Sequence, residues 1–220
     1  MSIIEVKNLY KTFDDRVIFK DFSLRVEQGE MLAITGESGC GKTTLLNIIG
    51  LLEPFDAGNV CIDGNCNVKV NSRKAGKILR ETISYLFQNF ALVEDDTVKY
   101  NLLLALKYCK FNVQEKARII YNALDAVGLC GFENKKIFHL SGGEQQRVAI
   151  ARCILKPSKI ILADEPTGSV DPQNREVILN LIQEMNRQGK TVVIVTHDPY
   201  VANKSSRQIH LPHAGNMSTH

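Results

Sequence analysis

Apolar residues follow three different patterns along the chain, and each pattern predicts a different kind of element. Short β-branched stretches bounded by turn residues predict a small antiparallel sheet near the N-terminus, at 3–6, 17–26 and 59–63. Nearly continuous apolar runs, typical of strands buried on both faces of a parallel sheet, lie at 31–35, 83–87, 160–163 and 191–196. Helical patterns follow two of these runs, at 42–49 and 173–187. The sequence therefore predicts an α/β core with a mainly parallel sheet.

The pattern changes between 89 and 156, where apolar residues recur at helical spacing and no strand-like run occurs. One predicted helix face comprises Val98, Leu102, Ala105, Leu106 and Cys109, and the next comprises Val113, Ala117, Ile120, Leu124 and Val127. The second helix is expected to begin at a capping box formed by Asn112 and Glu115 and to end at Gly128. A separate helical insertion and the core helices of one α/β domain would both give this pattern.

Composition and charge narrow the classes of function. The 220 residues suffice for one domain with a substantial core, and a net charge of +3 from 27 basic and 24 acidic side chains favours neither a nucleic-acid nor a lipid partner. Six cysteines without C-x-x-C spacing and the lack of a signal peptide favour a reducing cytosol, where we expect no disulfide. The longest apolar run falls well short of the roughly 18 to 20 residues of a membrane-spanning helix. Any membrane spans are therefore expected to come from another chain.

Residues 36–43 form a complete G-x-x-x-x-G-K-[ST] phosphate-binding loop between a predicted strand and a predicted helix. Its backbone N–H groups and the positive end of the helix converge on one point, where a triphosphate can bind. Lys42 supplies a point charge to the β- and γ-phosphates, and the Thr43 hydroxyl is placed to ligate Mg²⁺. A glycine-rich turn without function is disfavoured by the flanking strand and helix. The residues expected to bind ATP here are Gly36, Glu37, Ser38, Gly39, Cys40, Gly41, Lys42, Thr43 and Thr44.

Two carboxylates, Asp164 and Glu165, end the apolar run at 160–163. One of them can hold the water shell of Mg²⁺ while the next faces an attacking water, and only the second keeps the basicity of a general base. A carboxylate pair at a strand end is often only a turn or a helix cap. The preceding phosphate-binding loop favours the functional interpretation, with Asp164 at the metal.

Residues 141–144 read Ser-Gly-Gly-Glu, which is a capping box that predicts a helix from 145 to 155. A capped, glycine-lined helix N-terminus is also an anion site. The structural and the functional interpretations of these residues therefore agree in geometry.

Taken in order, the loop at 36–43, Gln88, the string Leu-Ser-Gly-Gly-Glu-Gln at 140–145, the pair Asp164–Glu165 and His197 resemble the ATP-binding-cassette (ABC) ATPases. The resemblance extends from about residue 3 to about residue 211. It implies a P-loop ABC ATPase fold with a mainly parallel core sheet, an N-terminal antiparallel β-subdomain and an inserted α-helical subdomain. The nucleotide-binding core would comprise 1–88 and 156–220, and the helical subdomain 89–155.

The resemblance also implies roles for individual residues. Glu165 is the family's catalytic base, Gln88 touches Mg²⁺ and relays the nucleotide state, and His197 contacts the γ-phosphate. An aromatic residue stacks on adenine, for which Phe13 is the candidate and Tyr10 a near rival. The signature residues Ser141, Gly142, Gly143 and Glu144 grip the ATP bound to a second copy of the chain, which implies an ATP-dependent head-to-tail homodimer.

Two positions depart from the family pattern. The segment 168–171 reads Gly-Ser-Val-Asp, where relatives usually have Leu before the Asp, and this puts signalling between subunits there in doubt. Cys40 stands in the phosphate-binding loop where Ser or Ala is common, and we expect a reactive thiol there that bound nucleotide would protect.

Local motifs resemble the branch of lipoprotein-releasing, macrolide-exporting, antimicrobial-peptide-resistance and bacteriocin-export ATPases. This branch implies an integral membrane permease as partner and a peripheral position on the cytoplasmic face of a bacterial membrane. The alternative is a soluble ABC ATPase that acts on nucleic acid or ribosomes, and a binding module with little turnover is a weaker third. The partner is expected in a groove near 88–100, on an apolar patch of Phe90, Leu92 and Val93, unless these three residues simply pack inside.

Overall fold

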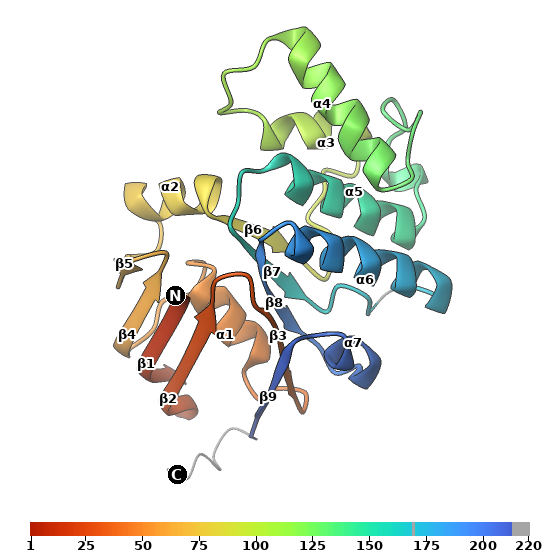
Figure 1. Ribbon diagram of the computed structural model, residues 1–220. Helices are drawn as coiled ribbons and strands as arrows, with labels where there is room; N and C mark the ends of the chain where they lie inside the picture. Colours follow the sequence, from red (N-terminus) through yellow and green to blue (C-terminus); the bar gives the residue numbers. More distant parts are fainter. Residues whose placement is uncertain (169, 213–220) are drawn as a thin grey trace.

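An antiparallel sheet forms one layer of the computed structural model, which describes residues 1–168 and 170–212 (Figure 1). Its strands lie in the order β2 (Arg16–Glu27), β1 (Ser2–Phe13), β4 (Ala57–Ile62) and β5 (Asn65–Cys66). Alternate residues of β1, among them Ile4 and Val6, face the core, because successive side chains of a strand point to opposite faces. The predicted antiparallel sheet is confirmed.

A parallel sheet of five strands forms the central layer. Its spatial order is β6 (Ile83–Leu86), β7 (Ile160–Asp164), β8 (Thr191–Val195), β3 (Met31–Gly36) and β9 (Arg207–Leu211). Every residue of β7 and β8 is buried, as the continuous apolar runs predict. The edge strand β9 escaped prediction because four of its five residues remain partly or fully exposed.

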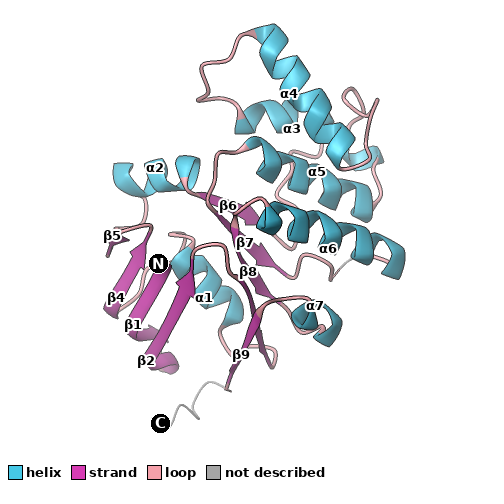
Figure 2. Ribbon diagram, in the orientation of Figure 1, coloured by secondary structure: helices cyan, strands magenta, loops and turns pink. Residues whose placement is uncertain are grey.

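Helices cover both faces of this sheet (Figure 2). The predicted helices after the phosphate-binding loop and the carboxylates are α1 (Lys42–Ile49) and α6 (Pro172–Arg187). Two further helices, α2 (Arg73–Glu81) and α7 (Pro199–Asn203), were not predicted. In α2 only Ala75 and Ile78 are buried, so its apolar stripe is too narrow to stand out in the sequence. No helix in the described part of the chain has the length and apolar character of a membrane span.

The helical segment comprises α3 (Val98–Ala105), α4 (Val113–Ala126), the short 3₁₀ helix η1 (Ile137–His139) and α5 (Gly142–Leu155). The predicted capping box of Asn112 and Glu115 begins α4. α5 lies between α3 and α4 on one side and β6 and α6 on the other (Figure 1). Its buried residues share a hydrophobic cluster with one face of the parallel sheet. The helices therefore extend the core of the sheet.

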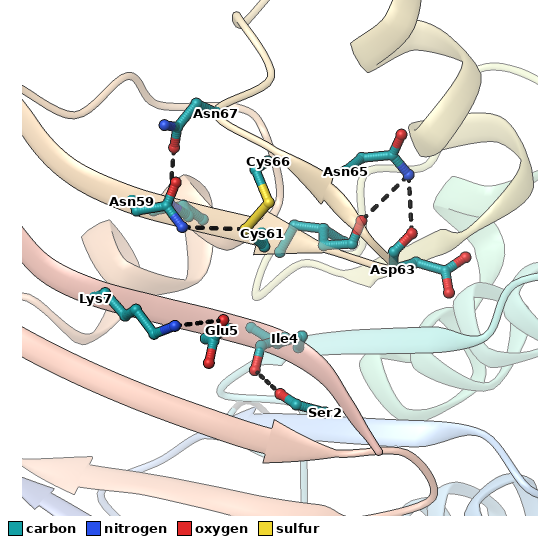
Figure 3. Close-up of a disulfide and its surroundings, with 12 residues drawn as sticks. Ser2, Ile4, Glu5, Lys7, Asn59, Cys61, Asp63, Asn65, Cys66 and Asn67 are labelled. Atoms are coloured by element: carbon teal, nitrogen blue, oxygen red, sulfur yellow. Dashed lines mark hydrogen bonds and ion pairs between the residues drawn. A yellow bond between two sulfur atoms is a disulfide. The ribbon is translucent and has the colours of Figure 1, made fainter.

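A disulfide joins Cys61 and Cys66, contrary to the expectation that none would form (Figure 3). The two residues are direct partners in the antiparallel ladder of β4 and β5, with Cα atoms 3.9 Å apart. Asn59 donates a hydrogen bond to the sulfur of Cys61 at 3.2 Å. The sequence spacing alone does not predict this pair, because the two cysteines meet only when the hairpin of β4 and β5 forms.

The loop after β6 is hydrogen-bonded to the helical segment, and the predicted apolar patch is therefore less exposed than expected. Arg152 of α5 donates hydrogen bonds to the carbonyls of Phe90 and Ala91. Phe90 and Leu92 are half-buried against the helical cluster, and only Val93 is 42% exposed. Phe90 and Leu92 thus pack partly against the helical segment, and the three residues form neither a fully exposed patch nor a fully buried cluster.

We expect Asn101→Ala to destabilise the fold by about 2 to 4 kcal/mol. The buried Asn101 side chain makes three hydrogen bonds to the loop backbone, each contributing about 1 kcal/mol. Loss of the side chain also leaves buried backbone groups unpaired. Urea unfolding monitored by circular dichroism measures this difference. Asn122→Ala, on the exposed side of α4, is the matched control and should change the free energy of unfolding by less than about 0.5 kcal/mol. Equal effects of the two substitutions would contradict the structural role of Asn101.

Candidate nucleotide-binding site

The phosphate-binding loop connects β3 to α1 and depends on glycine at its closest approach to β2. Gly41 caps α1 with a φ of +101°, and a Cβ there would lie 2.6 Å from Cγ2 of Ile18. Gly39 also has a positive φ, of +77°. Both glycines line the cavity at the N-terminus of α1, where backbone N–H groups are available to an anion.

Lys42 lies folded across this loop. Its ammonium donates hydrogen bonds to the carbonyl oxygens of Gly36 at 2.8 Å and Glu37 at 2.9 Å. These bonds close the loop into a ring around the cation. A phosphate group in the ring would meet backbone N–H groups and a positive charge together.

Asp164 ends β7 beside the loop and is 8% exposed. Thr43 donates its hydroxyl to Oδ1 of Asp164 at 3.2 Å, and burial raises the pKa of this carboxyl above its usual range. A bound cation would offset the free-energy cost of burying this carboxylate in its charged form. A threonine hydroxyl and a carboxylate are oxygen ligands of the type that Mg²⁺ prefers, so the pair fits that ion.

Glu165 is held in an uncommon backbone conformation, with a φ of +45°. Its carboxylate accepts a hydrogen bond from the Thr196 hydroxyl at 3.2 Å and lies 2.8 Å from Nδ1 of His197. The His197 side chain is 74% exposed, whereas that of Glu165 is 13% exposed. The sharp turn aims the Glu165 carboxylate toward the end of β8, where these two partners hold it.

Six of the nine predicted loop residues line one cavity of about 460 Å³ together with both carboxylates, Gln88 and His197, whereas Gly36, Glu37 and Cys40 do not line it. The predicted residues that line the cavity are Ser38, Gly39, Gly41, Lys42, Thr43, Thr44, Gln88, Asp164, Glu165 and His197. Sequence reasoning missed Arg16, which also lines the cavity and donates a hydrogen bond to the carbonyl of Gly39 at 2.9 Å. No local signal marks Arg16, because the pairing of β1 with β2 brings it there.

Phe13 and Tyr10 do not line this cavity. Phe13 ends β1 opposite Arg16 and is 43% exposed, with the Lys11 ammonium 4.4 Å from the centre of its ring. The structure thus places Phe13 next to a residue of the cavity and leaves its ring accessible.

The Ser-Gly-Gly-Glu segment begins α5 with the predicted capping box. The backbone N–H of Glu144 donates to the Ser141 hydroxyl at 3.3 Å, and the N–H of Ser141 donates to the Glu144 carboxylate at 2.7 Å. Gly143 packs so closely on α6 that an added Cβ would lie 2.6 Å from the side chain of Asn174. Neither Ser141 nor Gly142, Gly143 or Glu144 lines the cavity of the phosphate-binding loop.

A chain of polar contacts joins the start of α5 to the start of α6. Arg147 donates a hydrogen bond to Asn174 at 2.7 Å, and Asn174 donates to the carboxylate of Asp171 at 2.6 Å. Gln146 donates to the carbonyl of Pro166 at 2.8 Å, one residue after Glu165. Ser169, in the segment that departs from the family pattern, lies outside the described residues.

Comparison with known proteins decides the family. The model of the ABC transporter family matches residues 19–168. The chain belongs to the ABC transporter family. Its fold is that of solved ABC cassettes: the dimeric MJ0796 cassette matches with a TM-score of 0.88 and 38% identity over 95% of this chain and 94% of the other.

Relatives agree with this assignment. The ABC cassette is 40% identical to the uncharacterized ABC transporter ATP-binding protein YvrO of Bacillus subtilis, over 95% of this chain and 92% of YvrO. It is 39% identical to the macrolide export ATP-binding/permease protein MacB of Campylobacter jejuni, over 95% of this chain and 33% of MacB. The chain thus spans a third of the length of MacB. A second MacB match has 38% identity to a Neisseria gonorrhoeae protein.

The enzymatic class follows from the family. A further structure of MJ0796, in a post-hydrolysis state bound to ADP and phosphate, matches with a TM-score of 0.87 and 37% identity over 94% of each chain. The ABC cassette is accordingly an ATP-binding protein of the ATPase class.

Cys40 of the cassette is fully buried, so the expectation of a reactive, nucleotide-protected thiol is wrong. Its sulfur packs under Gly36, where an added Cβ would lie 2.7 Å from it. The thiol belongs to the hydrophobic cluster beneath the loop, and Cys40 does not line the cavity.

We therefore expect maleimide to label the exposed Cys130 of the native protein and to spare Cys40, with and without Mg-ATP, because the reagent cannot reach a buried thiol. Peptide mass spectrometry after timed labelling measures both sites. In urea both should react at similar rates. Rapid native labelling of Cys40 would contradict its burial, and a Cys40→Ser variant provides the control for peptide assignment.

Proposed function

We propose that this cassette hydrolyses ATP to power a membrane transporter whose membrane-spanning permease is a separate chain. One observation carries the proposal: the loop of Lys42, the Thr43–Asp164 pair and the Glu165–His197 pair meet in a single cavity at the carboxyl ends of β3, β7 and β8. Ligands bind at this edge in open parallel sheets. The cavity thus combines a phosphate cradle, a cation site and a base.

In this proposal the backbone of 36–44 and Lys42 bind the phosphates of ATP. Thr43, Asp164 and Gln88 hold Mg²⁺, which supplies charge neutralisation at the phosphates when bound. Glu165 accepts a proton from the attacking water, whose oxygen forms the bond to the γ-phosphorus as the bond to ADP breaks. His197 orients Glu165 and faces the γ-phosphate. Phe13, beside Arg16, is the proposed contact for adenine, and Tyr10 is its rival.

A second copy of the chain completes the site. We propose that Ser141, Gly142, Gly143 and Glu144 contact the γ-phosphate held by the partner, in a head-to-tail dimer around two ATP molecules. The start of α5 is capped and lined by glycine, which suits an anion, yet it lies outside the cavity of its own chain. The dimeric state of MJ0796 supports this arrangement.

The permease is proposed to dock in a groove of about 510 Å³ between α2, β6, α3 and α5. Tyr85 and Phe87 stack there with ring centres 4.1 Å apart, and Arg152 lines the same groove. This position replaces the patch predicted at Phe90, Leu92 and Val93, none of which lines the groove. It lies where the proposed core, 1–88 and 156–220, meets the proposed helical subdomain, 89–155.

Export or mechanotransmission of a peptide, lipoprotein or antimicrobial compound is the proposed activity of the whole complex, at the cytoplasmic face of a bacterial membrane. The name of the MacB relatives supports export. Co-purification of the tagged chain from detergent-solubilised native membranes tests this proposal. Recovery with an integral membrane protein would support it. Recovery with ribosomes or nucleic acid instead would favour the soluble alternative.

We expect Glu165→Gln to retain ATP binding while hydrolysis slows by about 10²- to 10⁴-fold, because the amide cannot accept the proton of water. Calorimetry measures binding and phosphate release measures turnover. The variant should also elute as a dimer with ATP in size-exclusion chromatography. Glu184→Gln, on the exposed side of α6, is the matched control and should hydrolyse at the wild-type rate. Wild-type turnover in Glu165→Gln would exclude this residue as the base.

We expect Ser141→Arg and Lys42→Ala to be inactive separately and to recover part of the activity when mixed. In a mixed dimer one site receives the intact loop of the first variant and the intact Ser141 of the second, whereas the other site carries both substitutions. Phosphate release across mixing ratios measures the recovery. Full activity of Ser141→Arg alone, or no recovery on mixing, would contradict a contact between chains.

A further inference from the structure

The positive charge of the chain is concentrated in one short segment. Residues 99–118 contain five Lys and Arg and one Glu, a net charge of +4, whereas the whole chain carries +3. The remaining residues therefore carry a net charge of −1. The near balance of the whole sequence conceals this local excess.

Large apolar side chains are exposed within the same segment. Around the connection of α3 to α4, Leu104 is 42% exposed, Tyr108 70%, Phe111 43% and Val113 84%. Lys107 and Lys110 alternate with them and are exposed. We call residues 104–113 the basic–aromatic loop. A cluster of large apolar side chains on a solvent-exposed surface usually marks a contact surface.

The basic–aromatic loop projects from the helices on the side that carries α2 (Figure 1). The guanidinium of Arg80, in α2, lies 5.0 Å from the centre of the Tyr108 ring. Leu104 and Tyr108 also line the groove proposed for the permease. The loop therefore adjoins the groove proposed for the permease.

The charges of this loop favour lipid headgroups as its partner. Among the described residues, no carboxylate forms an ion pair with Lys107 or Lys110, although eleven ion pairs occur elsewhere. Lysines can lay their apolar stems on a bilayer while their ammonium groups meet phosphates, and aromatic rings favour the headgroup region. A protein partner would instead be expected to cover a packed apolar face with few free charges.

We propose that the basic–aromatic loop binds the anionic surface of the membrane, with Tyr108, Phe111 and Val113 entering the headgroup layer and Lys107 and Lys110 contacting lipid phosphates. This inference rests on the proposed function only in that both place the chain at a membrane. The loop adds a contact to lipid beside the contact to the permease.

Vesicle sedimentation tests the contact without any permease. The full chain is mixed with vesicles of phosphatidylcholine alone or with about one third phosphatidylglycerol, at low and high salt. We expect binding to the anionic vesicles only, weakened by salt. Lys107→Glu with Lys110→Glu should weaken it at least tenfold, since each lysine contributes about fivefold. Phe111→Ser with Val113→Ser should weaken it while the salt dependence remains.

A matched control keeps the total change of charge the same. Lys7→Glu with Lys20→Glu alters two exposed lysines of the antiparallel sheet and should leave vesicle binding within twofold of wild type. Equal binding to neutral vesicles, no binding at all, or an equal loss in the control would overturn the proposal. So would variants that bind vesicles normally but lose co-purification with a membrane protein in detergent, because the loop would then be a protein contact. ATP hydrolysis in solution should be unchanged in every variant, which separates this result from a failure of the proposed ATPase site.

Discussion

Burial of the parallel sheet on both faces is the constraint on which the rest of the molecule depends. Along β7, Ile160 and Leu162 pack into the cluster shared with the antiparallel layer, whereas Ile161 and Ala163 pack into the cluster shared with α5 and α6. A strand that is buried on both faces is apolar along its length, and polar residues follow directly where its end becomes exposed to solvent. Polar groups therefore gather where β7 and β8 end, and the candidate site occupies that edge.

At this edge the backbone conformation of Glu165 determines where its charge lies. A residue other than glycine at positive φ costs free energy, of order 1 kcal/mol or more, and persists only where neighbours compensate. Thr196 and His197 provide that compensation through their contacts with the Glu165 carboxylate. The partners of the carboxylate thus stabilise both its position and the turn that produces it.

The sequence predicts features encoded locally and misses those created by contacts through space. The phosphate-binding loop, the carboxylates and the capping box at Ser141 are contiguous, so their chemistry is visible without a fold. The position of Arg16 in the cavity and the Cys61–Cys66 disulfide depend on strand register. The inward thiol of Cys40 depends on the direction of one side chain in a tight loop. Motif spacing contains neither register nor direction.

The contacts of Arg147 with Asn174 and of Gln146 with the carbonyl of Pro166 join the first turn of α5 to the segment that follows Glu165. If Ser141 contacts the ATP of a partner chain, as proposed, these hydrogen bonds connect the residue that contacts one ATP site to the base of the other site. If ATP binding at one site displaced α5, the positions of the residues around the ATP at the other site would change as well. The two sites of a dimer would then be mechanically coupled, and hydrolysis at one site would alter the geometry of the catalytic residues at the other.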